Sequence, residues 1–207
     1  MSACCDLSGD IPERQRRVLV VVLWINAAMF VAEFAGGLLA HSTALLADSV
    51  DMLGDAIVYG FSLHAVARGP AAKARAALVK GIIMAAFGAG VLVEVALKLI
   101  AGLVPSAGVM EGIGLVALGA NGVCLLLLSR HRADDINMRS AWICSRNDVV
   151  ANSGVLAAAI AVAVTGSAWP DIVMGLMIAA MFGTSAIGVI RRAREAWSSA
   201  RSARVGS

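Results

Sequence analysis

The chain has 207 residues, of which 59% are hydrophobic and 15% are charged, and its formal net charge is +3 at pH 7. Soluble domains carry about 25% charged residues, so the composition excludes an ordinary soluble enzyme and predicts an all-α membrane protein. The small positive charge gives no reason to expect nucleic-acid binding, because it lies between and beyond the apolar runs as it does in membrane proteins.

Apolar runs long enough to cross a hydrocarbon layer of ~30 Å occur six times along the chain. They cover approximately residues 18–40, 43–66, 75–103, 107–129, 140–166 and 171–190. Helix-stopping or polar residues separate them, as in "RGPAAK" after the second run and "SRHRADDINMRS" after the fourth. The sequence therefore predicts six transmembrane helices within residues 14–195, between a tail at 1–13 and a tail at 196–207.

The basic residues predict how these helices are oriented. Apart from Lys80, Lys98 and Arg146, every Lys and Arg lies before the first run, after the last, or in the connections that follow the second and fourth. The connections at residues 41–43, 103–107 and 166–171 hold none. The positive-inside rule then predicts that both termini are cytoplasmic.

The first two runs contain acids where a lipid-facing helix would have none. Glu33 in the first run either bonds within the bundle or lines a water path, and the sequence favours neither. The second run, "LLADSVDMLGDAIVYG", contains Asp48, Asp51 and Asp55. Each acid costs roughly 2.5 to 3.5 kcal/mol at the centre of a span, so these carboxylates require compensation.

The third run offers one compensating pair of its own. Glu94 and Lys98 are four residues apart in the order that favours an ion pair within one helix. We therefore expect Lys98 to pair with Glu94, which leaves the acids of the second run without a cation from this source.

The fifth run repeats the spacing of the second. Cys144 and Asp148 are four apart, as are Asp51 and Asp55, so each pair shares one helix face with about 6 Å between its members. Spans two and five run in opposite directions, which sets Asp51 near the level of Asp148 and Asp55 near that of Cys144. Oxygen and sulfur ligands at near-tetrahedral positions suit zinc or the softer cadmium.

A site with these four ligands would exchange metal for protons. Without the ion, repulsion and burial favour protonation of its acids, so binding a cation releases protons. The alternatives are that the polar residues only join helices by hydrogen bonds, or that two aspartates form a protease. The protease is disfavoured because "DMLGD" lacks a Gly-x-Gly-Asp element.

Five further residues are secondary metal candidates, each with a simpler alternative. Asp48 either relays ions outward or bonds a neighbouring span; His41 at the outer turn either binds a leaving ion or is merely solvated, which is commoner. Asn152 either orients Asp148 or joins helices. Cys4 and Cys5 either collect metal at the cytoplasmic mouth or have no role. All four cysteines are expected to be free thiols.

The combination of these motifs resembles the cation diffusion facilitator family of metal transporters. The segment "INAAMFVAEFAGGLLAHSTALLADSVDMLGD" is similar to the family's first two spans, and Asn121 and "CSRNDVVANSGV" match its later landmarks. The resemblance covers about residues 15–195. It implies efflux of zinc or cadmium, or of another divalent metal such as iron, cobalt, nickel or manganese, with protons as the counter-ion and no cofactor or catalysis.

The resemblance also implies a site and an assembly. The family's paired ligands fall on Asp51 and Asp55 and on Cys144 and Asp148, where the cysteine departs from the usual His or Asp and favours thiophilic ions. We expect a homodimer in the lipid bilayer of a bacterial inner membrane. The family's C-terminal cytoplasmic domain is not found in this sequence, so a dimer would form through small residues such as Gly175 and Gly183.

Overall fold

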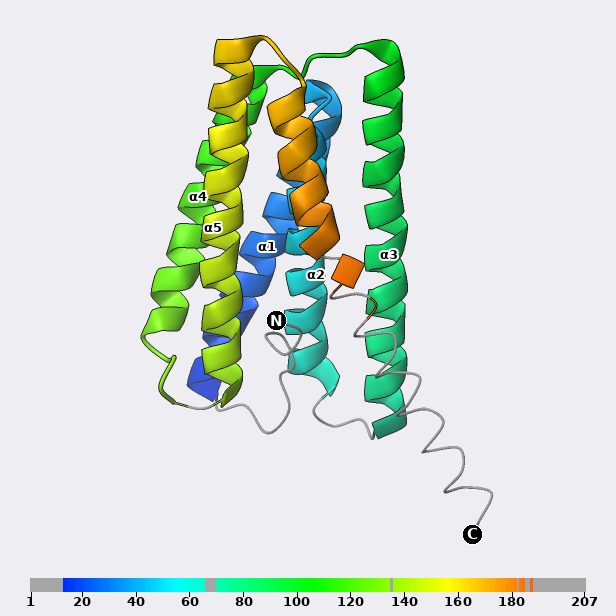
Figure 1. Cartoon of the computed structure of the whole chain (residues 1–207). Helices are drawn as coiled ribbons and strands as arrows, with labels where there is room; N and C mark the ends of the chain where they lie inside the picture. The colour runs from blue at the N-terminus through cyan, green and yellow to red at the C-terminus, as the bar shows by residue number, and fades with distance from the viewer. Residues whose placement is uncertain (1–12, 66–69, 135, 182, 185–186, 188–207) are drawn as a thin grey trace, which may run out of the picture.

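A computed structural model describes residues 13–65, 70–134, 136–181, 183, 184 and 187 of the chain (Figure 1). Its helices are α1 (Glu13–Ala40), α2 (Thr43–Ala65), α3 (Pro70–Ala101), α4 (Ala107–Ser129) and α5 (Ile136–Thr165), followed by a last described helix at Trp169–Met181. No strand occurs in these residues. The all-α class predicted from the apolar runs is confirmed.

Among the described residues, four helices are long and apolar enough to cross a membrane: α1, Gly81–Ala101 within α3, α4, and Ala141–Thr165 within α5. Helix α2 is long enough but contains three aspartates, and the last described helix, Trp169–Met181, is shorter. The apolar helices support an integral membrane protein. The six spans and the cytoplasmic termini stay predictions.

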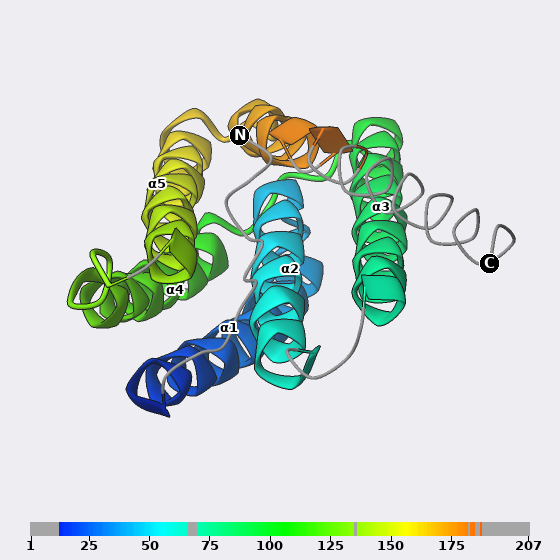
Figure 2. The ribbon, with the colours of Figure 1, turned by 90° about the horizontal axis from the view of Figure 1, so that it is seen from below.

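The helices form an up-and-down bundle with α2 near its centre. Figure 1 shows three short connections at one end, after α1, α3 and α5, and the beginning of α1 at the other. Helix α2 packs against α1, α3 and α5, and the view along the bundle in Figure 2 shows it between them. A residue on α2 can therefore meet side chains from several neighbours.

Polar side chains lie inside this bundle and large apolar ones outside. Trp24, Leu39 and Ile100 are 68%, 78% and 85% exposed, whereas Asn26 and Glu33 are at most 1% exposed. Lipid accepts the exposed apolar side chains at no cost, while the buried polar groups must find partners within the protein. The burial pattern suits a bundle surrounded by lipid.

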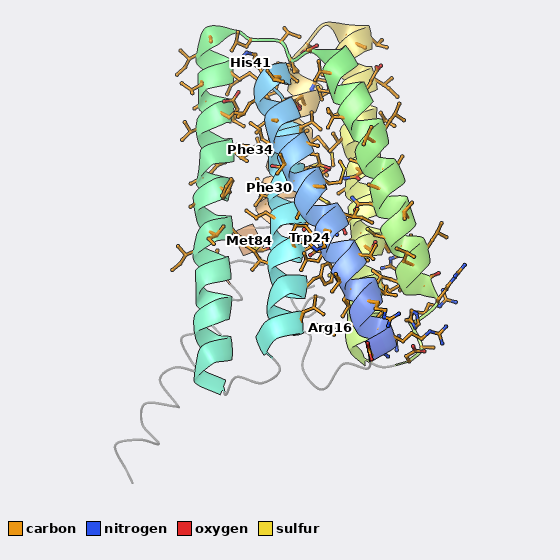
Figure 3. All side chains as sticks on the ribbon, turned by 180° about the vertical axis from the view of Figure 1, so that it is seen from behind. Arg16, Trp24, Phe30, Phe34, His41 and Met84 are labelled. Carbon is orange, nitrogen blue, oxygen red and sulfur yellow. The ribbon has the colours of Figure 1, made fainter. Side chains whose placement is uncertain are left out.

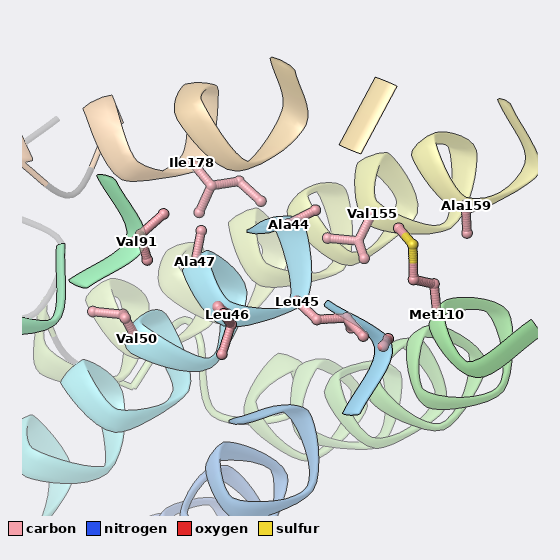
Figure 4. Close-up of a cluster of buried hydrophobic side chains, with 11 residues drawn as sticks. Ala44, Leu45, Leu46, Ala47, Val50, Val91, Met110, Val155, Ala159 and Ile178 are labelled. Atoms are coloured by element: carbon pink, nitrogen blue, oxygen red, sulfur yellow. The ribbon is translucent and has the colours of Figure 1, made fainter. Parts of the chain in front are cut away.

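Apolar packing fixes the first half of α2. Figure 4 shows Ala44, Leu45, Leu46, Ala47 and Val50 of this helix surrounded by side chains from other helices. The surrounding residues are Val91 of α3, Met110 of α4, Val155 and Ala159 of α5, and Ile178 of the last described helix. Asp48 lies within this anchored segment, and Asp51 and Asp55 follow it on the same helix.

An aromatic contact joins α1 to α3. Phe30, Phe34 and Phe87 form a triangle with ring centroids 5.7 to 5.9 Å apart, and Figure 3 shows the two α1 phenylalanines on the side of that helix that faces α3. Edge-to-face aromatic pairs of this kind contribute about 0.5 to 1.5 kcal/mol beyond their burial. The contact holds α3 beside the central helices.

The last described helix approaches the beginning of α2 closely. A Cβ added to Gly175 would lie 2.8 Å from the backbone carbon of Thr43, so only glycine permits this approach. Gly175 thus serves packing within one chain, where the sequence suggested a contact between chains. Gly183 is exposed.

Candidate metal site

The aspartates of α2 lie among the helices of the bundle. Asp48 and Asp55 are buried, with exposed fractions of 1% and 4%, and Asp51 is partly buried. Burial of ionised carboxylates is expensive unless a positive charge or several hydrogen-bond donors compensate it. The local sequence sets the spacing, because residues three and four apart occupy the same side of a helix.

Asp148 of α5 approaches these acids from a neighbouring helix. It is buried, lies within hydrogen-bonding reach of Asp51, and is close enough to Asp55 and Asp48 to feel their charges. Direct packing of α2 against α5 produces this arrangement. The structure therefore brings together three of the four predicted ligands: Asp51, Asp55 and Asp148.

Cys144 lies one turn before Asp148 on α5 and is buried, but it is disulfide-bonded in the structure. The expectation of a free thiol is wrong at this position, and a metal-binding thiolate here requires the reduced form. Cys124 of α4 is free and buried, and it lies near Asp55 and Tyr59. Sequence reasoning left this second thiol out, because no ligand-spaced partner accompanies it.

Tyr59 adds a hydroxyl to the same group. Its Oη donates a hydrogen bond of 3.1 Å to Oδ2 of Asp55, and the residue is almost fully buried. The signal was present in the sequence, since Asp55 and Tyr59 are four apart on α2. This bond fixes the direction of the Asp55 carboxylate.

Within the described residues, no group of three or more His, Cys, Asp or Glu side chains has an arrangement that could hold a metal ion. The set Asp51, Asp55, Cys144 and Asp148 thus stays a prediction as a coordination sphere. The carboxylates of Asp51, Asp55 and Asp148 nevertheless lie in one region of the bundle.

A chain of amides continues from Asp48 into α4. Nδ2 of Asn152 donates to Oδ2 of Asp48, and Oδ1 of Asn152 accepts a bond of 2.8 Å from Nδ2 of Asn121. The sequence suggested that Asn152 orients Asp148, whereas the amide is bonded to Asp48. Asp48 thus bonds a neighbouring helix through one of its two oxygens.

Glu33 of α1 belongs to the same polar region. It is fully buried, and the charges of Asp48 and Asp51 act on it. Neither Oε1 nor Oε2 has a hydrogen-bond partner among the described residues, and Oδ1 of Asp48 also has none. We refer to Glu33, Asp48, Asp51, Asp55 and Asp148 together as the acid column.

Lys98 does not pair with Glu94, so that prediction is wrong. Its Nζ lies 2.5 Å from Oδ2 of Asp171 and donates a bond of 2.8 Å to Oγ1 of Thr43, and both ion-pair side chains are fully buried. The long lysine side chain reaches across to the last described helix, where a carboxylate with further donors gives it a better partner than one on its own helix.

Asp171 also caps α2. Its carboxylate accepts bonds from the Thr43 and Ala44 backbone N–H groups at 2.8 and 3.1 Å and from the Ser42 hydroxyl at 2.6 Å. Ser42 in turn accepts a bond from the Leu45 N–H. Free N–H groups at a helix start favour such an anion. We call Ser42, Thr43, Lys98 and Asp171 the Asp171 cluster.

The remaining secondary candidates contribute nothing to this arrangement in the structure. His41 is exposed in the turn between α1 and α2 and has a φ of 51°. Cys4 and Cys5 lie outside the described residues. His41 as an exit ligand, and the two cysteines as a metal-collecting pair, stay predictions.

Comparison with known proteins adds an independent line of evidence. The profile of a family described as "Cation efflux transmembrane domain" matches residues 19–196. A protein from Cupriavidus metallidurans named "Metal cation efflux system protein CzcD" is 27% identical over 183 residues, which cover 83% of this chain and 58% of that protein. "Cation efflux system protein CzcD" from Alcaligenes sp. shows the same identity and coverage. The chain therefore spans somewhat more than half the length of these relatives.

Proposed function

The chain belongs to the family of the cation efflux transmembrane domain, and from this premise we propose that it exports zinc or cadmium from the cytoplasm in exchange for protons. The family match and both relatives' names support transport of metal cations in a membrane. The bacterial origin of the relatives supports a bacterial inner membrane, and the distribution of basic residues supports six spans with cytoplasmic termini. We also propose that it forms a homodimer.

The proximity of the Asp51, Asp55 and Asp148 side chains is the observation that supports the proposal most directly. These three carboxylates come from α2 and α5, and the buried Lys98 is bound to Asp171 and not to them. A divalent cation neutralises such a group, and protons neutralise it when the cation leaves. This alternation is the chemical basis for exchange.

Cys144 sets the expected preference among metals. In its reduced form it supplies sulfur beside three carboxylates, which favours thiophilic ions such as cadmium over iron, cobalt, nickel or manganese. Substitution Cys144→His replaces a soft ligand by imidazole, so we expect selectivity to move from cadmium toward zinc. Unchanged selectivity would remove the cysteine from the ligand set.

Transport into sealed vesicles tests the proposal. The purified protein, kept in reducing buffer, is reconstituted with a metal-sensitive dye and a pH-sensitive dye inside, and zinc or cadmium is added outside. We expect metal entry accompanied by proton exit, abolished by Asp55→Asn and retained by Glu13→Gln, which removes an exposed carboxylate at the beginning of α1. A parent protein that moves neither metal nor protons refutes the proposal and favours a purely structural role for the acids.

A further inference from the structure

Within the acid column, the pair Glu33 and Asp48 differs in chemistry from the group Asp51, Asp55 and Asp148. Glu33 comes from α1 and Asp48 from α2, and the charge of Asp48 acts directly on Glu33. Asp48 precedes Asp51 by three residues, which places it about 4.5 Å farther along α2 toward Ser42. Every donor atom here is an oxygen, whereas the free thiol of Cys124 lies near Asp55.

Three carboxylate oxygens in this place lack partners. Both oxygens of Glu33 and Oδ1 of Asp48 have no hydrogen-bond donor among the described residues, and the two residues are 0% and 1% exposed. Buried polar atoms are nearly always bonded, so each unpartnered one calls for an explanation.

The other oxygen of Asp48 is held in place. Asn152 donates to Oδ2, and Asn121 fixes Asn152 by a bond of 2.8 Å from α4. Asn152 occupies Oδ2, and Oδ1 has no donor among the described residues. Partners that fix a ligating carboxylate in this way are a regular feature of metal sites.

We propose that Glu33 and Asp48 form a second cation-binding position, made of oxygen alone, that takes a divalent ion on its way between the Asp51, Asp55 and Asp148 carboxylates and the Ser42 end of the bundle. This inference rests on the proposed function for the ion's route, and its binding test does not. Carboxylate oxygens bind hard divalent ions such as Mn²⁺, which distinguishes this position from a thiol-containing one.

Mn²⁺ binding, followed by the loss of the free-ion EPR signal, tests the position in isolation. The measurement starts from the double variant Asp55→Asn and Asp148→Asn, which removes two of the three carboxylates of the neighbouring candidate site. We expect this variant to bind one Mn²⁺ per chain, and addition of Glu33→Gln to weaken binding at least about 10-fold, as loss of a ligand or of its direct support does. Glu94→Gln, which neutralises an acid on α3, is the matched control and should leave binding unchanged.

A second substitution keeps the test valid if the Glu33→Gln protein does not fold. Asp48→Asn should weaken Mn²⁺ binding as Glu33→Gln does, with helix content by circular dichroism unchanged. Absence of Mn²⁺ binding to the double variant, or equal binding by the Glu33→Gln and Glu94→Gln proteins, overturns the inference. Failure of the proposed function is a separate result, since it appears as absence of zinc and cadmium transport by the parent protein.

Discussion

Two buried polar regions of this bundle are built in opposite ways. In the Asp171 cluster, the cation of Lys98 lies against the carboxylate of Asp171, which also accepts bonds from two backbone N–H groups and from the Ser42 hydroxyl. In the acid column, carboxylates face other carboxylates, and three of their oxygens have no donor among the described residues. The first region is complete by itself, and the second is the one that we propose takes up an ion or protons.

The comparison separates polar groups that hold helices together from groups that bind a ligand. Breaking a completed buried ion pair leaves an uncompensated charge and costs stability. Neutralising one member of a group of like charges relieves repulsion and costs binding instead. Substitutions in the two regions should therefore have opposite effects on stability and transport.

The largest effect is expected for Asp148→Asn. Transport of zinc and cadmium into vesicles should fall by more than about 100-fold, because even groups that merely support a ligand contribute about 10- to 100-fold. The thermal midpoint of the metal-free protein should be unchanged or higher, since one of several repelling carboxylates is gone. A lowered midpoint with normal transport would assign Asp148 to the structural class.

Asp171→Asn should show the reverse. It leaves Lys98 buried without its counter-ion, so we expect a loss of about 3 to 5 kcal/mol in the free energy of unfolding. Glu94→Gln is the matched control and should change stability by less than about 0.5 kcal/mol, as surface substitutions do. Denaturant unfolding in detergent measures both variants. Equal losses in the free energy of unfolding would indicate that Lys98 pairs with Glu94 after all.

Tyr59→Phe removes one hydroxyl and should have a smaller effect. Without the hydrogen bond to Asp55, that carboxylate is less well oriented, so cadmium affinity should fall by about 10-fold while the fold is retained. Ser153→Ala removes an exposed hydroxyl that bonds only its own helix, and it should leave affinity unchanged. Equal affinities for the two variants would show that Tyr59 only fills space.

The smallest effect concerns Asp134, in the connection between α4 and α5. A hydrogen bond from His131, at 2.8 Å, holds the pKa of Asp134 below its usual value, with a smaller contribution from Gln15. Because the folded-state pKa is depressed, the stabilisation is present above the unfolded value of about 3.9 and is lost as the pH falls through the folded value. His131→Ala should raise the Asp134 pKa in an NMR titration; an unchanged pKa contradicts the assignment.

Helical spacing predicted that Asp51, Asp55 and Asp148 lie close together, but it gave no sign of the Asp171 cluster. Asp51, Asp55 and Asp148 could be placed together because a spacing of four fixes the helix face and antiparallel packing fixes the level. Lys98 could not, because its true partner lies 73 residues away, and Glu94 offered a plausible local partner. Asp171 looked like part of a loop, since nothing local shows that a carboxylate caps a helix elsewhere.

The same limit applies to Asn152 and Glu33. The partner of Asn152 is Asp48, 104 residues away on α2, and sequence alone does not show that this distant residue lies closer to the amide than Asp148 of the same helix. Glu33 could be assigned to bundle bonding or to a water path, because sequence does not reveal which donors surround a buried acid. Its lack of partners among the described residues is visible only in three dimensions.

Equilibrium binding of cadmium to the reduced, purified protein tests the central claim most directly. Saturable binding should be present in the parent and in Asp171→Asn, provided that variant is folded under the conditions used, and lost in the double variant Asp51→Asn and Asp148→Asn. If the double variant binds cadmium as tightly as the parent, or if the parent binds none, the acids of α2 and α5 are not a metal site.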